Sequence, residues 1–583
     1  MKTLLIANRG EIAVRIIRTA RELGLRTVAI YSELDRDALH TKLADEAWNV
    51  GPAPSAESYL NQTRILEVAA ESGADAVHPG YGFMAENGEF AQKVTDAGLI
   101  WVGPPPAAIH LMGDKISSRR AAEAAGVSGV PGNTDPVTTA EEVIALADQF
   151  GYPIAIKAAH GGGGKGLKVV KSPDEVQSAL DSARREAEAY FGNAEVYVEK
   201  YLERPRHIEA QVLFDTHGNG VFLGERDCSV QRRHQKLIEE SPSSSVTPEQ
   251  RSELGEAALA VARAADYVNA GTVEFLMDKD GSFYFLEMNT RIQVEHAVTE
   301  MVTGIDLVRE QLRIAMGETL SSTEPPQLFG HAIEFRVNAE DPALNFMPSP
   351  GSIVEYFEPG GFGVRVDSGV VVESAVSQYY DNLIAKLVVW GSTREEALAR
   401  GKRALEEYRI RGIPTTIPAH LAIIAHPTFQ AGEHYTKFVE DEMDLSGLAT
   451  PPAAHLPEEE ELAERRMVVE VGGRRYVVRV WTPSVGPVSP GSQRVAPRRR
   501  APKLEKKAAS GESAGVIIAP MQGTIVKVHK KAGDSVVVDE ALCVLEAMKM
   551  ENEIRSPVEG EIVELRIQSG DTVSSGAVLL IIK

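Results

Sequence analysis

Cysteine is almost absent from the chain: only Cys228 and Cys543 occur among its 583 residues. Two cysteines so far apart exclude a disulfide framework and a CxxC zinc motif, which suits a reducing compartment. Long apolar runs are missing as well. The N-terminal stretch MKTLLIANRG is too short for a signal peptide, and no run approaches a membrane span. These absences predict a cytoplasmic protein that has no membrane partner.

Basic residues are scarce relative to acidic ones, with 61 against 83 and a formal net charge of −22. A field of that sign repels nucleic acid and anionic membranes, so we expect neither as a partner. Hydrophobic residues make up 43% of the chain and charged residues 25%, which is ordinary for a globular protein. The length exceeds what one core supports and predicts three or more domains.

Strand and helix patterns alternate in the first part of the chain. Residues 1–114 begin with the apolar run TLLIA, suited to a buried parallel strand, and continue as an α/β layer. No GxGxxG motif occurs there, so a dinucleotide site is not indicated. Residues 115–335 form a second region around a glycine-rich loop. Residues 336–447 mix strands and helices that complete its core.

The composition changes after residue 447. We interpret residues 448–513 as a linker rich in Pro, Ser, Gly, Ala and charged side chains. Within it, MVVEVGGRRYVVRVW (467–481) alternates on both sides of a Gly-Gly pair and predicts a β-hairpin. The basic run Arg498–Arg500 predicts a solvated spacer more readily than a nucleic-acid site.

An internal repeat fills residues 514–583. APMQGTIVKV matches SPVEGEIVEL, and Gly533-Asp534 matches Gly570-Asp571, each 37 residues further on. Two copies of such a unit predict a small all-β sandwich with two-fold symmetry. The first copy ends at Glu546, so the stretch AMKMENEI lies at the junction of the copies. This position predicts that Lys549 is displayed on an exposed turn.

The segment YPIAIKAAHGGGGKGLKVV (152–170) reads as strand, loop, strand. Four consecutive glycines disfavour helix and strand, and their N–H groups can surround phosphate oxygens. This is not a Walker A loop, because Lys165 is followed by Gly166 and not by Ser or Thr. The alternative is a flexible surface loop. Apolar strands on both sides, with Lys157 and Lys168 nearby, favour phosphate binding.

Residues 270–296, AGTVEFLMDKDGSFYFLEMNTRIQVEH, read as strand, DKDG turn, strand. A loop of two or four residues places Glu274 and Glu287 on one face as diagonal neighbours, whereas a three-residue loop places them on opposite faces. Two converging carboxylates need a cation, and Mg²⁺ bound with nucleotide phosphates fits best. The alternative is two solvated surface acids. A site is favoured by the polar residues at alternating positions that follow: Asn289, Arg291, Gln293 and Glu295.

At this point the sequence resembles biotin carboxylase, an ATP-grasp enzyme, over residues 1–447. The resembling stretches include IANRGEIAVR (6–15), HPGYGFMAEN (78–87), ERDCSVQRRHQKLIEE (225–240), EMNTRIQVEH (287–296) and EFRVNAED (334–341). The C-terminal segment is similar to a biotin carboxyl carrier domain, whose signature is AMKM. Together they resemble the α subunit of bacterial acyl-CoA carboxylases of the acetyl- or propionyl-CoA type.

The resemblance implies a multidomain fold of the α/β and α+β classes. The expected order is a Rossmann-like pre-ATP-grasp domain, an ATP-grasp domain, a biotin carboxylase C-terminal domain, a flexible linker and an all-β biotinyl carrier domain. Their expected bounds are 1–114, 115–335, 336–447, 448–513 and 514–583.

The resemblance also implies roles for individual residues. The nucleotide contacts that it implies are Lys115, Lys157, Gly161, Gly162, Gly163, Gly164, Glu199, Lys200, Leu202, His207, Gln231 and His234. The ligands that it implies for Mg²⁺ or Mn²⁺ are Glu274 and Glu287, with Asn289 beside them. The bicarbonate site that it implies contains Lys236, Arg291, Gln293 and Val294. Glu295 is then the general base, Arg336 stabilises the biotin enolate, and Lys549 carries biotin.

The implied reaction starts when bicarbonate, deprotonated by Glu295, attacks the γ-phosphate of ATP. Carboxyphosphate then releases CO₂, which carboxylates biotin in a site that excludes water. Two positions depart from the family pattern, His160 and Leu167, and both touch the shape of the nucleotide pocket.

No carboxyltransferase region is evident, so the acyl acceptor is expected on a separate β subunit. A biotin protein ligase is the second expected partner, and the carboxylase part can also dimerise. The hairpin at 467–481 either binds the β subunit or packs on the carboxylase domain.

Rival interpretations of the whole chain are another ATP-grasp carboxylate–amine ligase, a lipoyl carrier, or a scaffold with an inactive ATPase half. The first leaves the carrier repeat without a purpose.

Overall fold

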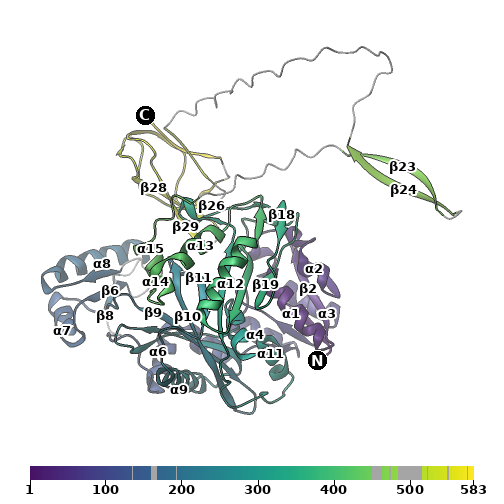
Figure 1. Cartoon of the computed structure of the whole chain (residues 1–583). Helices are drawn as coiled ribbons and strands as arrows, with labels where there is room; N and C mark the ends of the chain where they lie inside the picture. Colours follow the sequence, from purple (N-terminus) through teal and green to yellow (C-terminus); the bar gives the residue numbers. More distant parts are fainter. Residues whose placement is uncertain are drawn as a thin grey trace. The chain divides into compact units, whose positions relative to one another are not determined.

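A computed structural model describes residues 1–133, 136–158, 167–191, 194–448, 462–471, 474–483, 515–520, 523–547, 550–573 and 576–583. The chain divides into two compact units, Met1–Pro451 and Pro452–Lys583. Figure 1 traces the elements along the chain. In the described residues, no helix is both long and apolar enough to cross a membrane.

The N-terminal layer is a parallel five-stranded sheet in the order β3-β2-β1-β4-β5. Its strands are β1 (Thr3–Ile6), β2 (Arg26–Ser32), β3 (Glu46–Gly51), β4 (Ala76–His78) and β5 (Ile100–Trp101). The helices are α1 (Gly10–Glu22), α2 (Leu39–Leu43), α3 (Gln62–Ser72), α4 (Gly88–Asp96) and α5 (Pro106–Gly113). The strand order reverses between β1 and β4, the position where ligands bind in such folds. There, Asn8 Nδ2 donates to the carbonyls of Pro79 and Tyr81 at 2.6 and 2.7 Å.

A small antiparallel sheet, β7-β6-β8, carries the segment that leads into the glycine-rich loop. Its strands are β6 (Ile154–Ala158), β7 (Lys168–Val170) and β8 (Val196–Lys200), and its helices are α7 (Ala140–Phe150) and α8 (Val176–Phe191). The apolar side chains of these elements form a separate core. Residues 159–166 lie outside the described residues.

An antiparallel eight-stranded sheet, β13-β12-β9-β10-β11-β14-β21-β19, is the centre of the first unit. Its strands are β9 (Arg206–Phe214), β10 (Gly220–Arg232), β11 (Gln235–Ser241), β12 (Asn269–Met277), β13 (Phe283–Asn289), β14 (His331–Asn338), β19 (Val364–Ser368) and β21 (Leu383–Gly391). The boundary expected between residues 335 and 336 falls inside β14, which pairs with both β11 and β21. One sheet therefore joins the second and third regions.

The helices and short strands of the first unit complete its cores. The helices are α6 (Lys115–Ala124), α9 (Pro248–Ala264), α10 (His296–Thr303), α11 (Leu307–Ala315), α12 (Arg394–Glu407), α13 (Ile417–Ala425), α14 (Pro427–Gln430) and α15 (Phe438–Glu442). The short strands are β15 (Glu340–Asp341), β16 (Met347–Pro348), β17 (Gly351–Ser352), β18 (Glu355–Phe357), β20 (Ala375–Val376) and β22 (Arg409–Arg411). Apolar faces of α12 and α13 pack on β14 and β21.

The second unit begins with an antiparallel hairpin of β23 (Leu462–Val471) and β24 (Arg474–Pro483). It is longer than the expected 467–481, because residues 462–466, interpreted from composition as linker, also pair. Main-chain hydrogen bonds make a β-ladder, so charged side chains in this stretch do not prevent pairing.

The C-terminal repeat forms two four-stranded sheets, β25-β32-β30-β27 and β29-β28-β26-β31. The strands are β25 (Val516–Ile518), β26 (Gly523–Val528), β27 (Ser535–Val536), β28 (Ala541–Ala547), β29 (Met550–Arg555), β30 (Gly560–Leu565), β31 (Thr572–Val573) and β32 (Val578–Ile582). Each sheet takes two strands from each copy, so the copies interlock as the symmetry argument requires. The ladder between β28 and β29 runs to Ala547 and Met550. Met548 and Lys549, between them, lie outside the described residues.

Candidate active site

The charged residues singled out in the sequence meet around the Nζ atom of Lys236 on β11. This ammonium lies 2.8 Å from Glu295 Oε1 and 3.1 Å from Glu274 Oε1, and it also forms an ion pair with Glu209 on β9. Burial alone would lower the pKa of Lys236, but the three carboxylates outweigh it and raise that pKa well above its ordinary value. Lys236 is therefore a permanent cation.

Glu295, the residue immediately before α10, is held between two cations. Its Oε1 atom faces Lys236, and its Oε2 atom lies 2.8 Å from Arg336 Nη2. Arg336 is fixed in turn by Glu239, whose Oε1 accepts from Nε at 2.5 Å. Burial would raise the pKa of Glu295, yet Lys236, Arg336 and Arg226 hold it well below its ordinary value. The centre of the site is thus an ionised carboxylate flanked by two hydrogen-bond donors.

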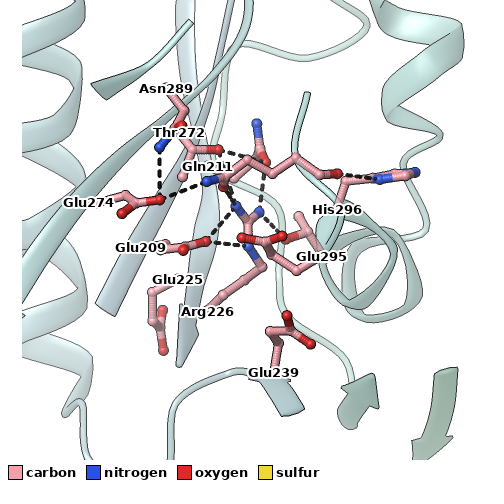
Figure 2. Close-up of polar contacts among 12 residues, drawn as sticks. Glu209, Gln211, Glu225, Arg226, Glu239, Thr272, Glu274, Asn289, Glu295 and His296 are labelled. Carbon is pink, nitrogen blue, oxygen red and sulfur yellow. Dashed lines mark hydrogen bonds and ion pairs between the residues drawn. The ribbon is translucent and has the colours of Figure 1, made fainter. Parts of the chain in front are cut away.

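Arg226 is a site residue that sequence reasoning missed. Its side chain is completely buried on β10, and Figure 2 shows its guanidinium in the middle of the polar cluster. It donates to Glu209 Oε2 at 2.9 Å and to Gln293 Oε1 at 2.5 Å, and Gln293 donates to Glu274 Oε1 at 2.8 Å. Its other partners are Gln211, Thr272 and Thr299. Arg226 thereby links strands β9 and β10 to the segment that carries Glu295.

Glu209, bound to both Lys236 and Arg226, was missed as well. A signal for both residues was present in the sequence. An arginine in the middle of a long, buried strand must find acidic or amide partners on a neighbouring strand, because a buried unpaired charge is costly. Glu209 and Gln211 alternate on β9, the strand beside β10, and so face the same side.

Glu274 and Glu287 lie directly opposite each other on β12 and β13. The connecting loop, Asp278–Ser282, has an odd number of residues, so it does not match the two- or four-residue case. By itself such a loop would put the two acids on opposite faces. A bulge at Leu286 adds one residue to β13 and restores the shared face.

The chemistry of this carboxylate pair suits a divalent cation. Partial loss of water around Glu287, which stays exposed, and the charge of Glu274 raise the pKa of Glu287. Glu274 Oε2 lies 2.9 Å from His207 Nε2, and Glu274 Oε1 accepts from Asn289 Nδ2 at 2.8 Å. Among the described residues, the compact group of metal-ligand type that contains Glu274 also contains His207 and Glu209, and it does not include Glu287.

Among the hydrogen bonds and ion pairs of the described residues, none joins Arg291 or Val294 to Lys236. Arg291 Nη2 donates to Asn289 Oδ1 at 2.9 Å, and its Nε atom forms a 2.9 Å ion pair with Glu86. The carbonyl of Val294 accepts from Nζ of Lys386 at 2.7 Å. The four residues expected to bind bicarbonate therefore border one region, and Lys236 lies at its centre.

The expected phosphate contacts gather around β6. Lys157 forms an ion pair with Glu199 on β8. Burial and the cations Lys115 and Arg119 lower the pKa of Lys157 to about 8. A bound polyphosphate would relieve the mutual repulsion among these cations.

The remaining expected nucleotide contacts are dispersed. Lys200 forms a 3.3 Å ion pair with Asp278, Leu202 and Gln231 are buried, and His234 is exposed in the turn between β10 and β11. The residues that lie outside the described part of the chain are His160, Gly161, Gly162, Gly163, Gly164 and Lys549. Leu167 is described and directly precedes β7.

Family models match four stretches of the chain. They are "Biotin carboxylase, N-terminal domain" over residues 1–109, "Carbamoyl-phosphate synthase L chain, ATP binding domain" over 114–323, "Biotin carboxylase C-terminal domain" over 334–441, and "Biotin-requiring enzyme" over 515–582. These matches confirm the expected fold classes and their order.

A curated relative spans the whole chain. The biotin-dependent acyl-coenzyme A carboxylase alpha3 subunit of Mycobacterium leprae is 47% identical over 100% of this chain and 98% of its own length. The chain belongs to the family of biotin-dependent acyl-CoA carboxylase α subunits. This α subunit is an ATP-grasp ligase that carries out the ATP-dependent carboxylation of biotin. The propionyl-CoA carboxylase alpha chain of Ruegeria pomeroyi is 37% identical over 99% of both chains.

A solved structure matches the carboxylase part of the α subunit. The biotin carboxylase domain dimer of Hydrogenobacter thermophilus 2-oxoglutarate carboxylase, in complex with MgADP, ADP and bicarbonate, is 46% identical, with a TM-score of 0.70. The match covers 77% of this chain and 99% of that chain. The first unit of the α subunit therefore has the biotin carboxylase fold.

Proposed function

We propose that the carboxyl group carried by the biotin of the α subunit is passed to a short-chain acyl-CoA, either acetyl-CoA or propionyl-CoA. This acceptor is bound by a separate carboxyltransferase β subunit. Two full-length relatives support this acceptor class, since one is named for acyl-CoA and the other for propionyl-CoA. None of the four matched stretches is a carboxyltransferase. Longer acyl chains and methylcrotonyl-CoA are the alternatives.

The observation that carries the proposed mechanism is the position of Glu295 between Lys236 and Arg336. Bicarbonate binds beside Lys236, with Arg291, Gln293 and Val294 around it, and draws both cations partly away from Glu295. The pKa of Glu295 then rises from its depressed value, and Oε1 or Oε2 takes the bicarbonate proton. The deprotonated bicarbonate attacks the γ-phosphorus of ATP, the bond between that phosphorus and the β,γ-bridging oxygen breaks, and ADP leaves. The resulting carboxyphosphate releases CO₂ and phosphate.

Glu274 and Glu287, with Asn289 beside them, are the residues that would hold Mg²⁺, or Mn²⁺, in this mechanism. The ion would screen the charge of the phosphoryl oxygens. Lys115, Lys157 and the four-glycine loop bind the phosphates, and His207 orients Glu274 through its contact with Oε2. In this proposal Arg336, fixed by Glu239, holds the ureido oxygen of biotin attached to Lys549.

Biotin protein ligase, which attaches the vitamin, is the second proposed partner. The carboxylase part is proposed to dimerise within a hetero-oligomer with the β subunit. The proposed compartment is the cytoplasm, where the buried thiols of Cys228 and Cys543 stay reduced. Burial raises the pKa of Cys228 well above its ordinary value, so this thiol is inert.

The experiment that tests the acceptor is purification of the intact complex from its host, followed by CO₂ fixation on a panel of acyl-CoAs. Acetyl-CoA or propionyl-CoA should give a kcat/KM about tenfold or more above that of methylcrotonyl-CoA and longer chains. A higher kcat/KM on one of the latter would overturn the proposed acceptor and leave the biotin carboxylase reaction unaffected.

Replacing Glu274 by glutamine is expected to raise the Mg²⁺ concentration for half-maximal ATP hydrolysis by about 10- to 100-fold, because one anionic oxygen pair is lost. The Mg²⁺ titration is run with bicarbonate and free biotin at saturation. Glu203→Gln, which removes an exposed acid paired with Lys279, is the matched control and should leave the titration unchanged. An unshifted titration in Glu274→Gln would remove Glu274 from the metal site.

Deleting the hairpin, residues 462–483, is expected to abolish copurification of the α subunit with the β subunit. Bicarbonate-dependent ATP hydrolysis with free biotin should persist, because the site lies in the first unit. Deleting an equally long part of the linker, residues 485–506, controls for the shortened tether. If the complex survives loss of the hairpin, the hairpin does not bind the partner, and its alternative role is packing on the carboxylase domain.

A further inference from the structure

The segment that carries Glu295 has no regular backbone pairing. Residues 290–295 connect β13 to α10 as an irregular stretch, so each carbonyl needs its own donor. His296 Nδ1 lies 2.7 Å from the Gln293 carbonyl oxygen, and the amide of Val298 donates to the Glu295 carbonyl at 3.3 Å. The Val294 carbonyl, directly before Glu295, accepts instead from a lysine side chain.

That donor, Lys386 on β21, has no solvent exposure at all. Its Nζ atom lies 2.7 Å from the Val294 carbonyl oxygen, 3.6 Å from Glu11 Oε2 and 3.8 Å from Asp367 Oδ2. Burial would lower the pKa of Lys386, but Glu11, Glu334 and Asp367 outweigh it and keep that pKa above its ordinary value. A buried ammonium is costly, so we expect the hydrogen bond from Lys386 to the Val294 carbonyl to serve a function.

The sheet register places Lys386 directly opposite Arg336 on β14, and directly opposite Asp367 on β19. Two neighbouring cations therefore reach the same dipeptide from adjacent strands. Arg336 holds the carboxylate of Glu295 at 2.8 Å, and Lys386 holds the peptide that precedes it. The side chain and the backbone of the general base are each fixed by one of them.

We propose that Lys386 is a positioning residue, whose ammonium fixes the Val294 peptide and through it the direction of the Glu295 carboxylate. The proposal rests on the proposed role of Glu295 as base. Glu11, from the N-terminal layer, and Asp367 balance the charge and anchor the ammonium on two sides. Without this bond the 294–295 peptide can rotate, and Arg336 holds only the tip of a mobile side chain.

The test uses the full chain and its ATP hydrolysis with bicarbonate and free biotin. Lys386→Met, similar in length but with neither charge nor donor, is expected to lower kcat about 100-fold, the effect of a displacement of roughly 1 Å at a reacting group. The KM for ATP should stay within about twofold, since no uniform binding contact is removed. Lys386→Arg restores the charge and the donors, so its kcat should be about tenfold higher than that of Lys386→Met.

The matched control is Arg365→Met. Arg365 is a cation of the same network, bound to Glu300 and Asp367, and it makes no contact with residues 290–295 among its hydrogen bonds and ion pairs in the described structure. A kcat in Lys386→Met that remains within about threefold of wild type overturns the proposal, as does an equal loss in Arg365→Met.

If Lys386→Met does not fold, a second measurement still tests the proposal. A crystal structure of the wild-type chain with bicarbonate should keep Nζ of Lys386 on the Val294 carbonyl, and a displaced ammonium overturns the proposal. A wild-type chain whose ATP hydrolysis ignores bicarbonate would instead contradict the proposed function.

Discussion

Replacing Lys549 by arginine is expected to abolish biotin attachment and all transfer of carboxyl groups to acyl-CoA. A guanidinium stays protonated in proteins and cannot act as the amine nucleophile that attachment requires. The charge and the fold of the carrier sandwich should persist. The assay combines intact mass, streptavidin binding and CO₂ fixation by the complex with its β subunit.

Lys530→Arg is the matched control, because Lys530 belongs to the same domain and forms an ion pair with Glu540. This variant should carry biotin as the wild-type chain does. With free biotin, Lys549→Arg should hydrolyse ATP at the wild-type rate, because the carboxylation site lies in the other unit. A biotinylated Lys549→Arg protein would refute the assignment of Lys549.

Glu295→Gln is expected to lower bicarbonate-dependent ATP hydrolysis about 1,000-fold, within the usual range for loss of a general base. The amide cannot take the bicarbonate proton, and the site also loses the anion that Lys236 and Arg336 share. The measurement is the steady-state kcat at saturating ATP, bicarbonate and free biotin.

The control for this variant is Glu256→Gln, which changes an exposed acid on α9 and should leave kcat unaltered. Because a buried change of charge can also destabilise, the thermal midpoint of both variants is compared with that of the wild-type chain. A folded Glu295→Gln enzyme with a kcat within about tenfold of wild type would exclude Glu295 as the base.

The order of domains and the interlocked carrier could be predicted because periodicity and repetition are written directly in the sequence. The sequence could predict that Glu274 and Glu287 share a face of the hairpin, but not the backbone geometry that brings them there. Their shared face depends on the bulge at Leu286, and a bulge has no reliable local signal because it is fixed by packing on the neighbouring strand.

The charge network behind the site could not be predicted from patterns. Lys386 lies in an apolar strand, where alternation gives no hint that a cation is buried, and the partners of Arg226 become evident only once β9 is known to lie beside β10. Arg226 pairs with Glu209 on the preceding strand, whereas Lys386 pairs with Glu11, a residue of α1 far away in the sequence. The boundary expected at residue 335 lies within β14, a central strand that pairs on both sides whatever its composition.

The most direct test of the central claim is ATP hydrolysis by the purified full-length chain carrying Lys549→Arg, so that free biotin is the only acceptor. We expect phosphate release to require bicarbonate and to be stimulated by free biotin. Phosphate release that is indifferent to both bicarbonate and biotin would contradict the assignment of this chain as a biotin carboxylase.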